Sequence, residues 1–500
     1  MSGMVLRCED DRLDVVVILG TRPEAIKCLP LIVQLRQNPR FHVVVINTGQ
    51  HRDMVQPVLN IAGIRPDFDL GIGASLQSLN SLVSGVIAGV SDVIEGLRAK
   101  DSSGDHPNSM VAFVHGDTST AMAGAVAAVQ SRIPVMHVEA GMRTGDTRSP
   151  FPEELNRQII ARLACLHFSP TVHSMEQLVR ERISADRIFV TGNTGIDALV
   201  WAANRPAGGE DEQIEAFLEQ RAGPLIVATA HRRESWGQGI GEIALGLRLI
   251  LDQRPEATLV IPLHPNPLVR RQITPVLENL PNVLLTDALG YCQFARLLRR
   301  ATLVVTDSGG IQEEAPSLGT PVLVTRESTE RVEGVEAGTL ELVGTDPSAI
   351  AKAALRILDA STSEAGVRFR EELVEANPYG DGYATPRIVA ALENIAFGDA
   401  APTPFGPGFS RNAVLEVAGY RTGKLNYPSR DEPLVATAES TKTQADRPHT
   451  SATEPHGFEG VERRSPTRHV RYIGPERRDR SRRVLTSHAK ESANTDADDG

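Results

Sequence analysis

The sequence predicts an α/β protein with two doubly wound domains, because short apolar runs rich in Val, Ile and Leu alternate with helix-length stretches. Such near-continuous apolar runs are typical of parallel strands that are buried on both faces of a sheet. A third observation supports this fold class. Polar motifs directly follow most of the runs, as expected where ligands bind at the carboxyl ends of parallel strands.

The apolar runs fall into two groups, and each group predicts the strands of one domain. The first group lies at 15–20, 42–47, 110–117, 134–141, 166–171 and 188–193. The second group lies at 225–231, 258–264, 283–289, 303–310 and 321–327. Helices are expected between strands, for example at 75–99, 119–130, 154–164, 238–253 and 311–318.

These elements divide the chain into a first domain, a second domain, a helix and a tail. Their boundaries are predicted at 14–193, 194–376, 377–398 and 399–500. The last hundred residues are rich in Pro, Ser, Thr and Gly and poor in large apolar residues, which predicts a disordered tail. Nine arginines gather at 463–483, either as a solvated polyampholyte or as a tether to RNA or an anionic membrane.

Charge and cysteine content restrict the class of protein. The net charge of -11 argues against nucleic acid as a partner of the folded core, since a phosphate backbone needs a positive surface. The sequence contains no apolar run of about 18 residues and begins without the apolar segment of a secretory signal. Its scattered cysteines are typical of reduced thiols; they are Cys8, Cys28, Cys165 and Cys292. We therefore expect a cytoplasmic protein without a membrane span.

The segment TDSGGIQEEAPSLG at 306–319 has the pattern of an anion-binding turn. Ser308, Gly309 and Gly310 lead from a predicted strand into a helix, where backbone N–H groups can approach a phosphate closely. Glu314 follows about one helical turn later and could accept hydrogen bonds from ribose hydroxyls. For the glycines taken alone, an ordinary strand-to-helix turn is the alternative interpretation.

The segment GTRPEAIK at 20–27 repeats this order of strand end, glycine turn and helix start, with Pro23 in the first helical turn. Arg22 and Lys27 could both reach a diphosphate. Basic side chains at a helix N-terminus oppose the helix dipole, so an anionic ligand would remove an unfavourable interaction. The alternative is surface charge on the first turn of a helix.

Carboxylates gather after the predicted strands of the first domain. Asp117 and Glu139 each close a strand, and Glu153 and Glu154 follow in the loop PFPEELNR. Neighbouring carboxylates suit acid–base chemistry because each raises the pKa of the others. From the second domain, His231 adds a group that can change charge near neutral pH. Helix capping by the carboxylates, or a backbone hydrogen bond from the imidazole, is the structural alternative.

The sequence lacks the motifs of several cofactor sites. Without GxxxxGK[ST] it is not a P-loop nucleotidase, and without GxGxxG after its first strand a nicotinamide cofactor is not expected. It also lacks HExxH and close His/Cys pairs of metal-ligand spacing. We therefore expect neither a cofactor nor a metal.

Taken in order, the motifs resemble those of bacterial non-hydrolysing UDP-N-acetylglucosamine 2-epimerases from about residue 14 to 398. The matching segments are GTRPEAIK, TGQH, VHGDTST, HVEAGMRTGD, PFPEELNR, VTGNTGIDAL, AHRRESWG, HPNPLVR, TDSGGIQEEAPSLGTPVLV and TERVEGVEAGT. The resemblance implies two Rossmann-like domains facing across a cleft, as in B-type glycosyltransferases, with 377–395 returning to the first domain. It also implies a homodimer that makes cell-surface polysaccharide precursors, by reversible epimerisation of UDP-N-acetylglucosamine at C2 through 2-acetamidoglucal.

The same resemblance implies roles for individual residues. The catalytic residues are Asp117, Glu139, Glu153 and His231. The substrate-binding residues are Arg22 and Lys27 near the diphosphate, Phe294 beside uracil, Ser308, Gly309 and Gly310 on phosphate, Glu314 on ribose, and Arg331 closing on the ligand. An activating site for a second UDP-N-acetylglucosamine would use Gln50, His51, Arg143 and His264. Leu289 stands where some members have a glutamine near uracil, so a backbone group would have to replace that contact.

Other functions share much of this pattern. A related epimerase would act on a modified UDP-diacetamido sugar, and a hydrolysing epimerase would release free N-acetylmannosamine. A B-type glycosyltransferase would use the same nucleotide site with an acceptor. A UDP-sugar sensor would bind without turnover, although the intact carboxylates argue against it.

Overall fold

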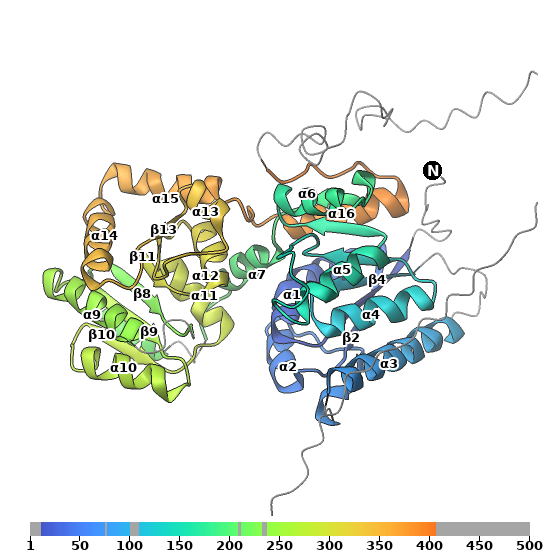
Figure 1. Ribbon diagram of the computed structural model, residues 1–500, viewed down its shortest axis with the longest axis horizontal. Helices are drawn as coiled ribbons and strands as arrows, with labels where there is room; N and C mark the ends of the chain where they lie inside the picture. Colours follow the sequence, from blue (N-terminus) through green and yellow to red (C-terminus); the bar gives the residue numbers. More distant parts are fainter. Residues whose placement is uncertain (1–11, 76–77, 101–109, 209–211, 233–237, 407–500) are drawn as a thin grey trace, which may run out of the picture. The chain divides into compact units, whose positions relative to one another are not determined.

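The computed structural model describes residues 12–406, with gaps at 76–77, 101–109, 209–211 and 233–237 (Figure 1). The predicted tail from residue 407 onward, with its arginines, lies outside the described residues. Two parallel sheets with intervening helices confirm the predicted α/β class and its two doubly wound domains. The described cysteines are free thiols; they are Cys28, Cys165 and Cys292.

The first sheet has the strand order β3-β2-β1-β4-β5-β6-β7, and all of its pairs are parallel. Its strands are β1 (Leu13–Leu19), β2 (Phe41–Asn47), β3 (Phe68–Asp69), β4 (Met110–His115), β5 (Val135–Val138), β6 (Leu166–Ser169) and β7 (Ile188–Val190). Val15 of β1 pairs with Val43 on one side and with Val111 on the other. The order in which successive strands join the sheet therefore reverses between β1 and β4, and such switch points are where open α/β sheets bind ligands.

Helices cover both faces of this sheet, because successive side chains of a strand point to opposite faces. Val15 and Val17 of β1 share a core with α1, α2 and α16 (Ala384–Phe397), whereas Val16 and Ile18 share a core with α3 and α4. The helices of this domain are α1 (Arg22–Gln37), α2 (Arg52–Asn60), α3 (Leu79–Lys100), α4 (Ser119–Gln130), α5 (Glu153–Leu163) and α6 (Val172–Arg180). None of the helices within the described ranges is both long and apolar enough to cross a membrane.

The second sheet has the parallel order β10-β9-β8-β11-β12-β13. Its strands are β8 (Leu225–Thr229), β9 (Thr258–Pro262), β10 (Val283–Thr286), β11 (Leu303–Thr306), β12 (Val322–Val324) and β13 (Leu340–Leu342). Its helices are α8 (Glu212–Glu219), α9 (Gln238–Gln253), α10 (Pro267–Leu277), α11 (Tyr291–Arg300), α12 (Gly309–Glu314), α13 (Val332–Glu336), α14 (Pro347–Ala360) and α15 (Glu364–Ala376). The switch point here lies between β8 and β11, directly before the motifs AHRRES and DSGG.

The helix predicted at 311–318 differs in the structure. α12 begins earlier, at Gly309, and the chain continues after Glu314 as a 3₁₀ turn at Ala315–Leu318. Pro316 has no backbone N–H to donate and so cannot continue the α-helical hydrogen-bond ladder. Gly319 ends the turn in the left-handed conformation, with φ of 70°.

Two helices connect the sheets and complete the first domain. α7 (Thr194–Ala203) follows β7 and is capped by Asn193, whose side chain accepts from Gly195 N. α16 (Ala384–Phe397) places Ile388 in the core that also contains β1. Asp197 of α7 accepts hydrogen bonds from the first two residues of α16, at 3.1 and 2.7 Å, and so fixes where this helix starts.

The chain after α16 remains packed on the first domain for several residues. Phe405 is 9% exposed and lies in a small core with Val190 and Val172. Its backbone N–H donates to Val190 O at 2.8 Å, and the Arg387 guanidinium lies 5.5 Å from its ring centre. The packed chain thus extends beyond residue 398, where the sequence had placed the end of the ordered part.

Candidate active site

The first sheet ends in a buried carboxylate, Glu139, which directly follows β5. Its Oε2 lies 2.5 Å from Lys27 Nζ and 3.2 Å from His115 Nε2, and its side chain is 8% exposed. Burial alone would raise the pKa of Glu139, but Lys27 and His115 lower it to about 2. Glu139 is therefore ionised at neutral pH. It also adopts a left-handed backbone, with φ of 63°, which costs a residue with a Cβ about 1 kcal/mol.

Lys27 thus lies beside a carboxylate, rather than standing alone at a helix start. The negative charges of Glu313 and Glu314, in the second domain, also stabilise the Lys27 ammonium. Together with Glu139 they keep the pKa of Lys27 raised, although burial alone would lower it. The motif GTRPEAIK predicted that Lys27 reaches a diphosphate, and this stays a prediction. The ion pair with Glu139 could not be predicted, because the two residues are 112 positions apart.

Asp117 follows β4, the strand that pairs with β5. Its Oδ2 lies 2.6 Å from Arg157 Nη2, and its backbone carbonyl accepts from Asn156 Nδ2 at 2.9 Å. The preceding carbonyl, of Gly116, accepts from His137 Nε2 at 2.8 Å. Burial raises the pKa of Asp117, and the Arg157 guanidinium only partly offsets this. The two strand-end carboxylates therefore differ, because Glu139 is held ionised while Asp117 binds a proton more readily.

The neighbouring carboxylates Glu153 and Glu154 have different surroundings. Glu154 is fully buried and accepts from Thr144 N at 3.0 Å, Gln158 Nε2 at 3.1 Å and Arg157 Nη1 at 3.2 Å. It therefore fixes the loop before α5. Glu153, the first residue of α5, is only half-buried and is the carboxylate of this pair with more access to a ligand.

The second sheet contributes His231 and the glycines that start α12. His231 Nδ1 lies 3.0 Å from an oxygen of the buried Asp307, and its ring stacks on His264 at 5.8 Å. A methyl group on Gly309 would lie 3.0 Å from the Arg331 guanidinium and 3.2 Å from Arg232 Nη2. Because Gly309 has no side chain, the guanidinium groups of Arg331 and Arg232 can both lie close to the start of α12. Sequence reasoning missed Arg232 and Asp307, although both stand inside motifs that it had singled out.

Glu313 and Glu314 occupy the end of α12. Glu313 accepts from Arg331 Nε and from Asn193 Nδ2, each at 2.9 Å, and so connects the second sheet to the start of α7. Burial raises the pKa of Glu314 to about 8, helped by the negative charge of Glu313. A raised pKa makes Glu314 able to donate as well as accept hydrogen bonds near neutral pH. Sequence reasoning named Glu314 but missed Glu313.

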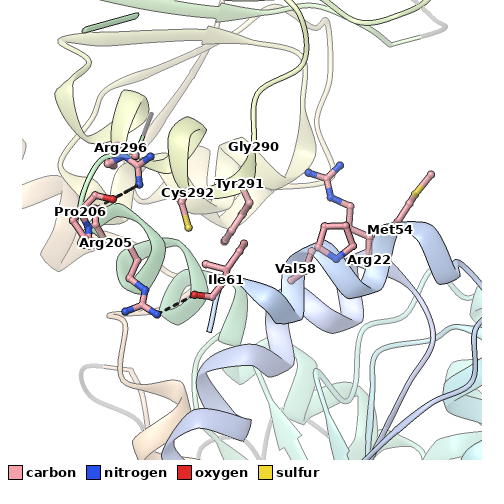
Figure 2. A pocket seen from close by; sticks show the side chains of 12 residues that line it. Arg22, Met54, Val58, Ile61, Arg205, Pro206, Gly290, Tyr291, Cys292 and Arg296 are labelled. Carbon is pink, nitrogen blue, oxygen red and sulfur yellow. Dashed lines mark hydrogen bonds between the residues drawn. The ribbon is translucent and has the colours of Figure 1, made fainter. Parts of the chain in front are cut away.

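A cavity of about 640 Å³ is lined by residues of α1, α2 and α11, among others (Figure 2). One wall is Arg22 at the start of α1 together with Met54 and Val58 of α2. The opposite wall is Gly290 and Tyr291, at the start of α11, with further residues that include Cys292, Arg205 and Arg296. Phe294 is not among the residues that line this cavity; it packs on the core beneath α11.

The four residues assigned to an activating site have dissimilar environments. Gln50 Oε1 accepts from Thr120 at 2.7 Å, and His51 is exposed at the start of α2. His264 stacks on His231, beside the second sheet. Arg143 is 6% exposed and forms two hydrogen bonds with Glu181, at 2.6 and 3.0 Å. That ion pair holds the Arg143 guanidinium against Glu181, the residue that directly follows α6.

Among the residues described, no group of three or more His, Cys, Asp or Glu side chains is arranged to hold a metal ion. The arrangement instead offers two carboxylates of different proton affinity at one sheet, and a cluster of cations around a glycine turn at the other. Carboxylates can exchange protons with a ligand. A glycine turn with two guanidinium groups can bind phosphate.

Comparison with known proteins identifies a family. Residues 33–393 match the profile of the family described as UDP-N-acetylglucosamine 2-epimerase. A UDP-N-acetylglucosamine 2-epimerase of Yersinia pestis is 43% identical over 387 residues, covering 76% of this chain and 99% of that protein.

Solved structures of the same family are also similar to this chain. The UDP-GlcNAc 2-epimerase of Neisseria meningitidis, bound to UDP-GlcNAc, is 38% identical with a TM-score of 0.62, covering 76% of this chain and 99% of that one. A glycosyltransferase of Rickettsia africae is 10% identical, with a TM-score of 0.52 over 78% of this chain and all of that one. This last likeness concerns the fold alone, and it agrees with the predicted glycosyltransferase-like architecture.

Proposed function

The chain belongs to the UDP-N-acetylglucosamine 2-epimerase family, and we propose that it is an isomerase that interconverts UDP-N-acetylglucosamine and UDP-N-acetylmannosamine. The observation that carries this proposal is the pair Asp117 and Glu139. These carboxylates stand at neighbouring strand ends of one sheet and differ in proton affinity. By its family resemblance, the enzyme would supply precursors of cell-surface polysaccharides.

The reaction proceeds by elimination and re-addition. A carboxylate removes the proton from C2 of the sugar while the C1–O bond breaks, and the electron pair of that bond leaves with UDP. The electron pair of the C2–H bond becomes the double bond of 2-acetamidoglucal. A proton then adds to the opposite face of C2 and the UDP oxygen adds to C1. This route avoids an isolated carbanion at a weakly acidic carbon.

The two carboxylates would divide the acid–base work. Asp117 is the stronger base of the two, because its pKa is raised by burial, and it is the better group to take a proton from carbon. Glu139 stays ionised beside the Lys27 ammonium, so a proton that it receives passes readily to the sugar. Glu153, half-buried at the start of α5, would be the third carboxylate at the sugar.

UDP would lie along the second sheet. Its phosphates would meet the N–H groups of Gly309 and Gly310, with Ser308, Arg331 and His231 around them. The ribose would meet Glu314. The cavity between Arg22 and Tyr291 has the volume for a nucleotide base. It lies near Glu314, whose charge helps to raise the pKa of Tyr291. Phe294 would support this base pocket from the core beneath it.

The direct test is to incubate the purified protein with UDP-N-acetylglucosamine alone in deuterated buffer and to follow the sugar by NMR. We expect a mixture with UDP-N-acetylmannosamine and deuterium at C2, without added nucleotide cofactor or metal. Release of free N-acetylmannosamine would instead indicate a hydrolysing epimerase. No product and no exchange at high enzyme concentration would contradict the proposal.

We also propose an activating site, a homodimer and a cytoplasmic location. A second UDP-N-acetylglucosamine would contact Gln50, His51 and His264, with Arg143 joining only if it leaves Glu181. The reverse reaction should then show a lag that added UDP-N-acetylglucosamine abolishes, and lag-free hyperbolic kinetics would count against the activating site.

For the homodimer, light scattering at micromolar concentration should give twice the chain mass of 54.0 kDa. Cell fractionation tests the location.

A further inference from the structure

Arg157 lies on α5 and has no role in the function proposed above. Its side chain is only 14% exposed, and a guanidinium is costly to bury unless carboxylates or other acceptors surround it. Its partners are Asp117, which lies just after β4, and Glu154 of its own helix. These two contacts therefore indicate what Arg157 does.

The guanidinium of Arg157 uses different nitrogens for the two carboxylates. Nε donates to Asp117 Oδ2 at 2.9 Å, and Nη2 lies 2.6 Å from the same oxygen. Nη1 donates to Glu154 Oε2 at 3.2 Å. Glu154 is fully buried and is itself held by Thr144 N and Gln158 Nε2. Glu154 therefore fixes one side of the guanidinium, and the other side holds Asp117.

The backbone around Asp117 is also held in place. Asn156, the neighbour of Arg157 on α5, donates from Nδ2 to Asp117 O at 2.9 Å. His137 Nε2 donates to Gly116 O at 2.8 Å, since a carbonyl oxygen can only accept. Among the residues described, none donates to Asp117 Oδ1. Asp117 thus has a fixed backbone, one carboxylate oxygen engaged by Arg157 and a second oxygen available to a ligand.

We propose that Arg157 is a positioning residue for the epimerisation, holding the Asp117 carboxylate by Oδ2 so that Oδ1 is turned to the proton on C2 of the sugar. The proposal rests on the function proposed above. Two nitrogens of one planar guanidinium on a single oxygen restrict rotation of the carboxylate. A general base needs this, because it must lie within hydrogen-bond reach of the proton that it removes.

The same contact affects how readily Asp117 binds a proton. Burial raises the pKa of Asp117, and the nearby charges on it are Arg157 from α5, Glu139 after β5 and Lys27 from α1. Glu139 and Lys27 form an ion pair at 2.5 Å, so their opposite charges partly cancel at Asp117. Arg157 is the cation that contacts Asp117 itself. Without it the pKa of Asp117 should rise further, and less of the base would be ionised at neutral pH.

The substitution Arg157→Gln tests the proposal. We expect turnover at pH 7 to fall by about 10²-fold, the usual scale for impairing an acid–base group. The KM for UDP-N-acetylglucosamine should change by less than about tenfold, because Arg157 lies behind the base. Between pH 7 and pH 9 the deficit in turnover should narrow by about tenfold, as Asp117 becomes ionised. Wild-type turnover at pH 7, or a deficit that does not change with pH, would overturn the proposal.

The effect on Asp117 can also be measured without any activity. In full-length protein labelled with ¹³C at the aspartate carboxyl carbons, the Asp117 signal is assigned by its loss in Asp117→Asn. Its titration should move to higher pH in Arg157→Gln than in the wild type. If wild-type protein does not epimerise UDP-N-acetylglucosamine, the proposed function fails, and the titration still decides whether Arg157 acts on Asp117. The same titration in both proteins would overturn the proposal.

Two further variants separate positioning from folding. Arg162→Gln is the matched control, because Arg162 lies on the same helix but donates to Glu181 O at 2.9 Å from an exposed position. It should leave turnover unchanged. Arg157→Lys keeps the positive charge without the planar fork, and it serves if Arg157→Gln does not fold. Its turnover should stay about tenfold below that of the wild type, with a smaller dependence on pH than in Arg157→Gln. Wild-type turnover in Arg157→Lys would contradict the positioning role.

A double-variant cycle tests whether Arg157 acts through Asp117. In an Asp117→Asn background, Arg157→Gln should lower the remaining turnover by less than about threefold, because residues that act as a unit are not additive. C2 deuterium exchange at high enzyme concentration measures this remaining turnover. A full further loss of about 10²-fold in that background would show that Arg157 acts through something other than Asp117.

Discussion

At the scale of single residues, Glu139 has a left-handed backbone conformation and a side-chain carboxylate that is both ionised and buried. Lys27 stabilises that charge, and each partner of such a pair is costly to bury without the other. The pair also sets the proton affinity of the carboxylate, because Lys27 is the largest of the influences that lower the Glu139 pKa. Stability and chemistry at this residue therefore depend on the same contact.

Removing both partners should cost less than the two single removals added together. We expect Glu139→Gln and Lys27→Met each to lower the free energy of unfolding by about 3 kcal/mol, since each leaves an uncompensated buried group. The double variant should lose clearly less than the sum of the two. Urea denaturation at pH 7 measures all three. Strict additivity would mean that the 2.5 Å contact contributes no coupling.

The adjacent residues Glu153 and Glu154 form a matched pair for a second prediction. Glu153→Gln should lower turnover by about 10²-fold or more with little change in the melting temperature, because an acid–base group is lost from a half-buried position. Glu154→Gln should mainly lower the melting temperature, because it weakens three hydrogen bonds that hold Thr144, Arg157 and Gln158. The reverse result would exchange their roles.

At the scale of elements, the strands β4, β5 and β6 carry three buried histidines. His137 and His167 are paired in register, with ring centres 6.4 Å apart, and His115 lies on the neighbouring strand. Burial lowers the pKa of His115 and of His137 to about 4, and it lowers the pKa of His167 as well. Among the described residues, neither ring nitrogen of His167 has a hydrogen-bond partner.

This arrangement predicts acid sensitivity with a defined sign. Because the folded pKa lies below the unfolded value of 6.5, the unfolded chain binds more protons, and stability is lost as pH falls from about 6.5 toward 4. In His167→Leu, the loss of unfolding free energy between pH 7 and pH 5 should be smaller by about 2 kcal/mol. His173→Gln, which removes an exposed histidine of α6, is the control variant. An unchanged slope in His167→Leu would contradict the assignment.

The sequence predicted elements better than it predicted contacts. Val-rich runs such as 15–20 predict strands because their whole length is apolar, and glycines after them predict the turns at their ends. The pairing of Lys27 with Glu139, or of Arg143 with Glu181, depends on which strands become neighbours. No local pattern encodes that choice, so the sequence could not show the Arg143–Glu181 ion pair. The assignment of Arg143 to an activating site stays a prediction.

At the scale of the whole molecule, the ordered chain closes on the first domain through Phe405. A protein ending at Gly406 should keep the turnover and stability of the full chain, whereas one ending at Gly398 should unfold more easily. Phe405→Ala in the longer form should cost about 3 kcal/mol, the lower end for a buried phenylalanine. Thermal unfolding of the three proteins measures this. Equal melting temperatures would show that the contact with Val190 contributes nothing.

The return of α16 also determines when the protein can fold during its synthesis. Val15 and Ile388 share one core, yet the second leaves the ribosome more than 370 residues after the first. At about 5–20 residues per second, β1 waits roughly 20–75 s for α16, which joins α1 and α2 in covering one of its faces. The second domain is made entirely within that interval and has all of its strands before the first domain can finish. For that time a nascent chain carries an uncovered apolar surface on its first sheet, which makes translation speed and chaperone capture part of how this fold is reached.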